Sequence, residues 1–314
     1  MAEGLEGGMI FGKAVILSCG ALLVFVLSAC GGQGGGPGGG PTRVVVTYSL
    51  LGDLVENVGG GSVEMTTLVG PNGDAHTFEP APSDNAELAE ADLVFQNGLG
   101  FEPWLGELYQ SSGSEAKRVV VTENVDPLLV TGEGRGSEPD PHVWHDPTKS
   151  MVMVRSIRDA LAEADPENAE AYRRNAAEYT VKLEKLDADV REQVRSIPGD
   201  NRTLFTSHDT FGYFARRYGF GVDTALASVS TDASDPSAGR TADLVEKIEA
   251  SGVPAIFAEN VSNPSYMEGI ASEAGVELAP ALYTDALGRP GSEGGTYVGM
   301  VRYNVSTMSE ALQE

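Results

Sequence analysis

Arg43–Tyr48, with the sequence RVVVTY, is the stretch that decides the fold class. A continuous run of β-branched residues is typical of a strand buried on both faces, as the strands of parallel sheets are. A helical pattern at 50–58 and a second strand pattern at 63–69 follow it. Strand and helix patterns alternate in this way through most of the chain, which predicts an α/β fold built on parallel sheets.

The rest of the first half continues the alternation. We expect a helix that starts at Pro82-Ser83-Asp84, with Ser83 as its N-cap. The segment 132–141, rich in Gly and Pro, leads to a helix that begins after Pro147. The other elements expected in this half are strands at 92–96 and 118–121 and a helix near 104–109.

The second half repeats the pattern. A strand at 203–206 is followed by a helix that we expect to open at Ser207-His208-Asp209 and to run through Tyr218. The later elements expected are strands at 223–227, 254–258 and 277–283, and helices at 243–250, 266–274 and from Tyr297 to the end.

A long helix is predicted between the two halves. Apolar residues recur at threes and fours from Tyr172 to Ile197, and Pro166 suits the first turn. About 30 residues at a rise of about 1.5 Å would span roughly 45 Å. A coiled coil would show the same repeat, but the position at mid-chain favours a single helix that joins two lobes.

The N-terminus is predicted to be a secretion signal. Ala14–Leu27 is an apolar run too short for a comfortable membrane span, and Lys13 precedes it. It ends in Leu27-Ser28-Ala29-Cys30, which resembles the lipobox of bacterial lipoproteins, so we expect a lipid on Cys30. The acidic residues before Met9 favour Met9 as the true start. The glycine-rich stretch after Cys30 is typical of a flexible tether.

These patterns predict five regions. They are a signal peptide at 1–29, the lipidated Cys30 with its tether at 30–42, a lobe at 43–165, the connecting helix at 166–197 and a second lobe at 198–314.

Charge and cysteine content exclude some classes of function. The formal net charge is −25, which argues against nucleic acid as a partner. Of the two cysteines, Cys19 lies in the predicted signal, so the mature chain can form no internal disulfide.

The four histidines are the main indication of function. His142 and His145 lie in Asp140–Pro147 (DPHVWHDP), whereas His76 and His208 stand alone in loop-like contexts. A single histidine is most often a hydrogen-bonded structural residue, but neutral imidazole is also the commonest protein ligand for transition metals. The case for a metal site therefore rests on the whole set.

The places of these residues predict that they converge. Ligands of open α/β sheets bind beyond the carboxyl ends of strands, and His76, His208 and Asp285 each follow a predicted strand. With His142 they would supply three nitrogens and one oxygen, which is a complete first shell for a tetrahedral zinc ion. A site placed between two lobes would couple metal binding to their closure.

Several stretches together resemble the bacterial metal-binding lipoproteins that supply zinc or manganese to ABC importers. Beyond the lipobox, these stretches are 74–84, 97–105, 140–147, 207–214 and 282–285, and they occur in the family's order across the mature chain. The resemblance implies two α/β lobes joined by one rigid helix, with one divalent ion held by His76, His142, His208 and Asp285. It also implies an extracytoplasmic, lipid-anchored binding protein, not an enzyme, whose partner is the permease of a metal importer; we expect a monomer.

Two residues have open roles. The position of His145 is usually apolar in that family, which favours a surface or supporting histidine. Because residues three apart can face one centre, His145 could instead join or replace His142. Glu259 ends a predicted strand and could orient a ligand, although an ordinary surface or ion-pair role is the simpler interpretation.

Other functions remain open at this point. A secreted zinc hydrolase would use similar ligands, but it needs an open coordination position and a general base, and the chain has no HExxH motif. An adhesin is a second alternative, since family members have borne that name. A binding protein for an organic solute would leave the histidines unexplained.

The donor set favours zinc over manganese. Nitrogen-rich sites suit zinc, and the intrinsic affinity order places zinc above manganese for the same ligands. Manganese stays the alternative, because relatives with this ligand set are linked to both. Binding should weaken as pH falls through the histidine range near 6.5, because the imidazoles must be neutral to bind.

Overall fold

The computed structural model describes residues 40–131, 137–226, 228–231 and 237–313. The predicted signal peptide, Cys30 and most of the tether lie outside these residues. None of the helices in the described part of the chain is long and apolar enough to cross a membrane. Residues 41–314 form one compact unit.

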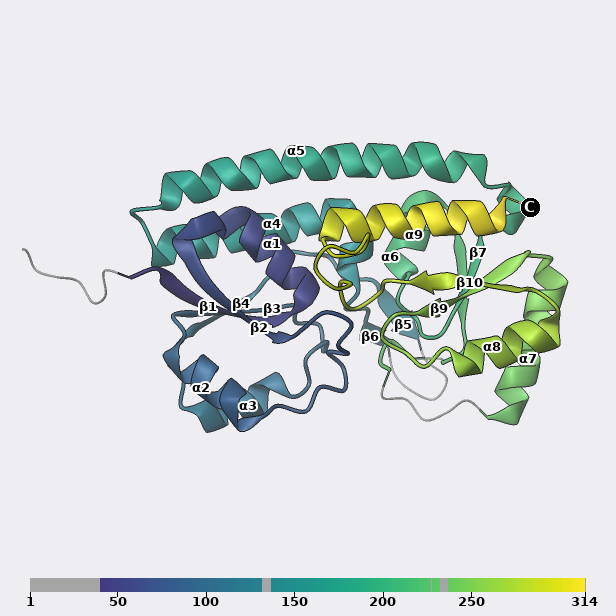
Figure 1. Cartoon of the computed structure of the whole chain (residues 1–314), viewed down its shortest axis with the longest axis horizontal. Coiled ribbons are helices and arrows are strands. Elements are labelled where there is room, and N and C mark those ends of the chain that lie inside the picture. Colours follow the sequence, from purple (N-terminus) through teal and green to yellow (C-terminus); the bar gives the residue numbers. More distant parts are fainter. Residues whose placement is uncertain (1–39, 132–136, 227, 232–236, 314) are drawn as a thin grey trace, which may run out of the picture. The chain divides into compact units, whose positions relative to one another are not determined.

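The first half is built on a four-stranded parallel sheet with the order β2-β1-β3-β4. Its strands are β1 (Thr42–Tyr48), β2 (Val63–Val69), β3 (Leu93–Gln96) and β4 (Lys117–Val120). Val44 and Val46 of β1 pack in the main core with α1 (Ser49–Gly59) and α4 (Pro147–Ala164). Val45 points to the opposite face, where α2 (Pro82–Glu90) and α3 (Leu105–Ser112) cover the sheet (Figure 1). The β-branched run is therefore buried on both faces.

The second half contains two parallel strand pairs. β7 (Thr203–Thr206) pairs with β8 (Gly221–Thr224), and β9 (Ala255–Glu259) pairs with β10 (Glu277–Leu282). Phe205 and Ile256 pack against helices α7 (Ala238–Ser251) and α8 (Ser265–Ala274). Among the described residues, this half also contains the α-helices α6 (Gly212–Tyr218) and α9 (Tyr297–Leu312).

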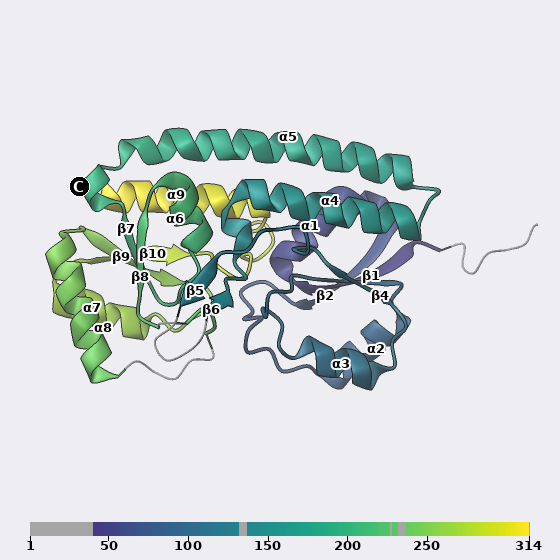
Figure 2. The ribbon, with the colours of Figure 1, turned by 180° about the vertical axis from the view of Figure 1, so that it is seen from behind.

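The long helix is α5, Ala169–Gln193, and a 3-10 turn at Val194–Ser196 extends it. Its 25 residues span about 38 Å, somewhat less than the sequence predicts. Tyr179 donates a hydrogen bond to Asp53 of α1 at 3.1 Å, and Asp187 accepts two from Arg217 of α6 at 2.7 and 2.8 Å. α5 therefore contacts both halves of the chain (Figure 2). The α/β class, the two lobes and the long helix are confirmed, whereas the domain boundaries stay a prediction.

Two local predictions are wrong, and one further element was not predicted. Ala81, not Ser83, is the N-cap of α2, because Pro82 already has the fixed φ of a helical first residue, and Asp84 accepts a hydrogen bond from Ala81 N at 2.7 Å. The helix expected to open at Ser207 begins only at Gly212. A short antiparallel pair, β5 (Leu129–Thr131) with β6 (Ser137–Pro139), occupies a segment for which no strand was expected.

Candidate metal centre

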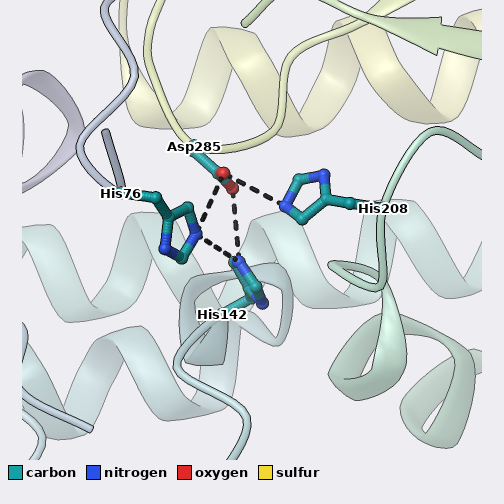
Figure 3. Close-up of side chains that lie close together, drawn as sticks. All are labelled: His76, His142, His208 and Asp285. Atoms are coloured by element: carbon teal, nitrogen blue, oxygen red, sulfur yellow. Dashed lines mark hydrogen bonds and ion pairs between the residues drawn. The ribbon is translucent and has the colours of Figure 1, made fainter. Parts of the chain in front are cut away.

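Four side chains from separate segments converge at the ends of the strands (Figure 3). His76 lies in the loop after β2, His208 follows β7, and Asp285 follows β10. His142 immediately precedes a 3-10 turn, Val143–His145, that leads into α4. One potential ligand atom from each of the four lies within 4.8 Å of all the others. The structure thus brings together the four residues that the sequence singled out.

The separations fit a single small cation. Nε2 of His76 lies 3.3 Å from Nε2 of His142. The oxygens of Asp285 lie 3.5 Å from Nε2 of His76, 3.6 Å from that of His142 and 3.1 Å from that of His208. A tetrahedral zinc ion with bonds of about 2.0–2.1 Å would place neighbouring ligand atoms about 3.3 Å apart. These four separations lie close to that value, and the remaining ones among the four groups do not exceed 4.8 Å.

The four side chains are almost completely shielded from solvent. His76 is 5% exposed, and His142, His208 and Asp285 are each 0% exposed. Among the described residues, Nε2 of His208 and Oδ2 of Asp285 have no hydrogen-bond partner although both are buried. Buried polar atoms without partners are rare in native proteins, and both of these face the centre of the cluster.

Each of the three clustered histidines is hydrogen-bonded to a carboxylate. Asp74 accepts a hydrogen bond from the backbone N of His76 at 2.8 Å. Asp140 accepts one from the backbone N of His142 at 2.9 Å and lies 2.8 Å from its Nδ1. With Nδ1 committed to the carboxylate, Nε2 of His142 is left free for a ligand.

Glu259 contacts His208 as Asp140 contacts His142, through the backbone N and through the ring Nδ1. Its Oε1 accepts from the backbone N of His208 at 2.9 Å, and its Oε2 lies 2.5 Å from Nδ1. Glu259 is 2% exposed, which excludes an ordinary surface role. The structure therefore places it where a residue that orients a ligand would stand.

Aromatic rings form one wall of the cluster. The ring of Phe101 lies 4.7 Å from that of His76, and the ring of Trp144 lies 5.3 Å from that of His142. Trp144 also donates from Nε1 to the carbonyl of Thr284 at 2.9 Å, which ties the His142 segment to the Asp285 loop. The apolar wall keeps water away and strengthens electrostatic interactions inside.

Burial and neighbouring charges shift the pKa values of the histidines and carboxylates of the cluster in different directions. Burial lowers the pKa of His142 well below its usual value, so this imidazole is neutral at physiological pH. Burial would also lower the pKa of His208, but the carboxylates of Glu259 and Asp285 outweigh it and raise that pKa well above the usual value. Burial opposes ionisation of Asp285, yet the positive charge of the neighbouring His208 keeps its pKa well below the usual range. Burial raises the pKa of Asp140 to about 7.

His145 lies beside the cluster but outside it. It is 3% exposed, so a surface position is excluded, and its ring lies 4.4 Å from that of Phe211. Its Nε2 lies 3.2 Å from Oγ1 of Thr210, and Thr210 in turn donates to Oδ1 of Asp285 at 3.4 Å. Burial lowers the pKa of His145 to about 3.

The sequence analysis missed Asp74, Asp140 and Thr210. The two aspartates share a signal that could have revealed them, because each stands two residues before a histidine, in Asp74-Ala75-His76 and Asp140-Pro141-His142. An Asp side chain readily accepts a hydrogen bond from the backbone two residues on. Thr210 has no such local signal, since it reaches Asp285 only through the tertiary fold.

Comparison with known families gives one match that spans most of the chain. Residues 44–311 match the family described as zinc-uptake complex component A, periplasmic. That range includes all four clustered side chains and both lobes.

Individual relatives match over nearly their whole length. The manganese-binding lipoprotein MntA of Halalkalibacterium halodurans is 33% identical over 93% of this chain and 96% of its own. The manganese ABC transporter substrate-binding lipoprotein PsaA of Streptococcus mitis is 30% identical, with the same coverage. Among solved structures, the periplasmic zinc binding protein TroA from Treponema pallidum superimposes with a TM-score of 0.82 at 33% identity, covering 88% of this chain and 100% of that one.

Proposed function

We propose, because the chain belongs to the family of zinc-uptake complex component A periplasmic proteins, that it captures one divalent transition metal ion and delivers it to an ABC importer. His76, His142, His208 and Asp285 would bind the ion, which is the cargo of the protein. The chain is a binding protein and not an enzyme, in line with relatives that are named as metal-binding and substrate-binding lipoproteins.

One observation carries this proposal. Four buried groups from both halves face one point, and among the described residues Nε2 of His208 and Oδ2 of Asp285 have no partner outside the cluster, where they form an ion-pair contact with each other at 3.1 Å. Burying such groups without partners costs free energy, and a bound cation would supply the missing interactions.

The origin of the ligands suggests how the cargo is released. His76 and His142 come from the first half of the chain, and His208 and Asp285 come from the second. Any separation of the two halves would divide the donor set and weaken binding. A permease that holds the halves apart could therefore take the ion from the site.

A zinc hydrolase is the less favoured function. The catalytic metal of such an enzyme keeps an open position for water and needs a general base nearby. Here the four donors can close a tetrahedral shell, and the neighbouring carboxylates of Asp140 and Glu259 are bonded to ligand histidines.

We further propose zinc as the ion that binds more tightly in vitro, with manganese as the alternative. Three imidazoles and one carboxylate form a nitrogen-rich site, and the affinity order places zinc above manganese. The relatives give support to both, since two are named for manganese and one solved structure is named for zinc.

The experiment is a competition titration of the metal-free protein with both ions at neutral pH. Tighter binding of zinc supports the assignment, and tighter binding of manganese overturns it. If neither ion binds, the proposed function itself is wrong.

The attachment to the membrane is a separate proposal. The relatives named as lipoproteins support a lipid on Cys30, which would hold the protein at the outer face of the cytoplasmic membrane, beside its permease. Cys30→Ala should abolish labelling of the protein by a radioactive fatty acid in growing cells. Labelling that persists in this variant would contradict the assignment.

A further inference from the structure

A chain of two hydrogen bonds supports Asp285 from outside the cluster. It runs from Nε2 of His145 to Oγ1 of Thr210 at 3.2 Å and from Thr210 to Oδ1 of Asp285 at 3.4 Å. Its members are 3%, 0% and 0% exposed. They come from the turn before α4, the loop after β7 and the loop after β10. Neither His145 nor Thr210 is among the four proposed ligands.

The direction of both bonds follows from their chemistry. An ionised carboxylate can only accept, so the hydroxyl of Thr210 must donate to Asp285. The oxygen of Thr210 then has lone pairs free to accept from Nε2–H of His145. His145 therefore fixes the rotation of the hydroxyl, and the hydroxyl fixes one oxygen of Asp285. The backbone N of Thr210 is itself bonded to the carbonyl of His208 at 3.1 Å, which holds the residue in place.

The two oxygens of Asp285 are consequently not equivalent. Oδ1 receives the hydroxyl of Thr210, whereas Oδ2 has no hydrogen-bond partner among the described residues and lies 3.1 Å from Nε2 of His208. A carboxylate with one oxygen bonded from outside and the other free is prepared to bind a cation through a single oxygen.

We propose that His145 and Thr210 are positioning residues that keep Asp285 a one-oxygen ligand and thereby favour a four-coordinate ion over ions that take more oxygen ligands. Zinc is typically four-coordinate in closed sites, whereas manganese favours six-coordinate, oxygen-rich surroundings. This inference rests on the proposed function and adds a determinant of metal preference to it. Both bonds are long for their type, so they tune the preference and do not create the site.

The test compares metal preference among purified full-chain variants. Thr210→Val removes the hydroxyl at nearly constant volume, Thr210→Ser keeps it, and His145→Leu removes the donor behind it. The control is Thr122→Val, a buried threonine whose hydroxyl bonds to the carbonyl of Asn97 and not to Asp285. For each protein, the ratio of the zinc and manganese dissociation constants and the visible absorption of bound Co²⁺ are measured.

We expect Thr210→Val and His145→Leu to shift the ratio toward manganese by about 2- to 10-fold, less than a short hydrogen bond to a carboxylate contributes, because both bonds are long. The Co²⁺ absorption should lose the intensity typical of tetrahedral cobalt. Thr210→Ser and Thr122→Val should behave like the wild type. Unchanged ratios in the Val and Leu variants overturn the inference, as does an equal shift in Thr210→Ser. A wild type that binds neither ion would instead refute the proposed function.

Discussion

Glu259 contacts His208 at two points, through the backbone N at 2.9 Å and through Nδ1 at 2.5 Å. A histidine held in this way cannot rotate its ring, and its Nε2 is directed at Asp285, 3.1 Å away. The carboxylate therefore fixes the position of the imidazole and, once an ion displaces the proton on Nε2, its tautomer, as carboxylates bonded to metal-bound histidines generally do.

Replacing Glu259 should weaken metal binding without abolishing it. In Glu259→Gln, the amide keeps the shape but loses the charge and one acceptor, so we expect affinity for zinc to fall about 10- to 100-fold. Glu273→Gln, at an exposed position on α8, is the matched control and should bind like the wild type. Titration with a competing chelator measures both, and equal affinities for the two variants would contradict the role given to Glu259.

Alanine variants separate ligands from supporting residues. His76→Ala, His142→Ala and His208→Ala each remove a proposed ligand, so their loss of affinity should exceed the roughly 100-fold upper range of a supporting residue. His145→Ala should cost far less, because its nearest polar contact is Thr210 and not the cluster. If His145→Ala costs as much as His142→Ala, the assignment within Asp140–Pro147 is wrong.

Metal binding should release a proton at neutral pH. The carboxylates of Glu259 and Asp285 raise the pKa of His208 well above its usual value, against the effect of burial, so this imidazole is protonated in the metal-free protein. The ion must displace that proton, so affinity should rise with pH until the raised pKa of His208 is passed. His142 adds no pH dependence near neutrality, because burial lowers its pKa well below 6.5.

Calorimetry in two buffers of different ionisation enthalpy measures this release. The apparent binding enthalpy should differ between the buffers in proportion to about one proton per ion at pH 7. Identical enthalpies in the two buffers would show that His208 is already neutral and would refute this account of the charge in the site.

The fold is predicted to depend on a buried tyrosine of α9 that bonds to the 3-10 turn Val143–His145 and to α4. The hydroxyl of Tyr297 donates to the carbonyl of Trp144 at 2.7 Å and accepts from Ser150 at 2.9 Å. Tyr297→Phe leaves that carbonyl poorly satisfied, so the free energy of unfolding should fall by about 1–2 kcal/mol. Urea unfolding measures it, with the half-buried Tyr303→Phe on the same helix as control. Equal stabilities of the two variants would contradict this role of Tyr297.

The sequence predicts elements well where local patterns decide them. The strand at Val63–Val69 matches its prediction at both ends, and β1 begins only one residue earlier than expected. The helix expected at Ser207 fails because the segment is a loop shaped by contacts that are distant in sequence. Asp209 N donates to the carbonyl of Ser228 at 3.0 Å, and Glu259 holds His208. These contacts turn the chain at the point where His208 must face the cluster.

The prediction of the site has the same limit, because local sequence patterns do not encode contacts between residues that are far apart in the chain. The positions of His76, His208 and Asp285 at strand ends sufficed to predict that they meet, because parallel strands deliver their carboxyl ends to one edge. The partners behind them depend on how the loops fold. Thr210 reaches Asp285 across 75 positions in the sequence, and no local pattern encodes that contact.

The most direct test of the central claim is anomalous diffraction from crystals of the protein grown with zinc and measured above and below the zinc absorption edge. The account predicts one strong anomalous peak, surrounded by Nε2 of the three histidines His76, His142 and His208 and by Oδ2 of Asp285. No peak among these four side chains, or a peak ligated by His145 in place of one of them, would contradict it.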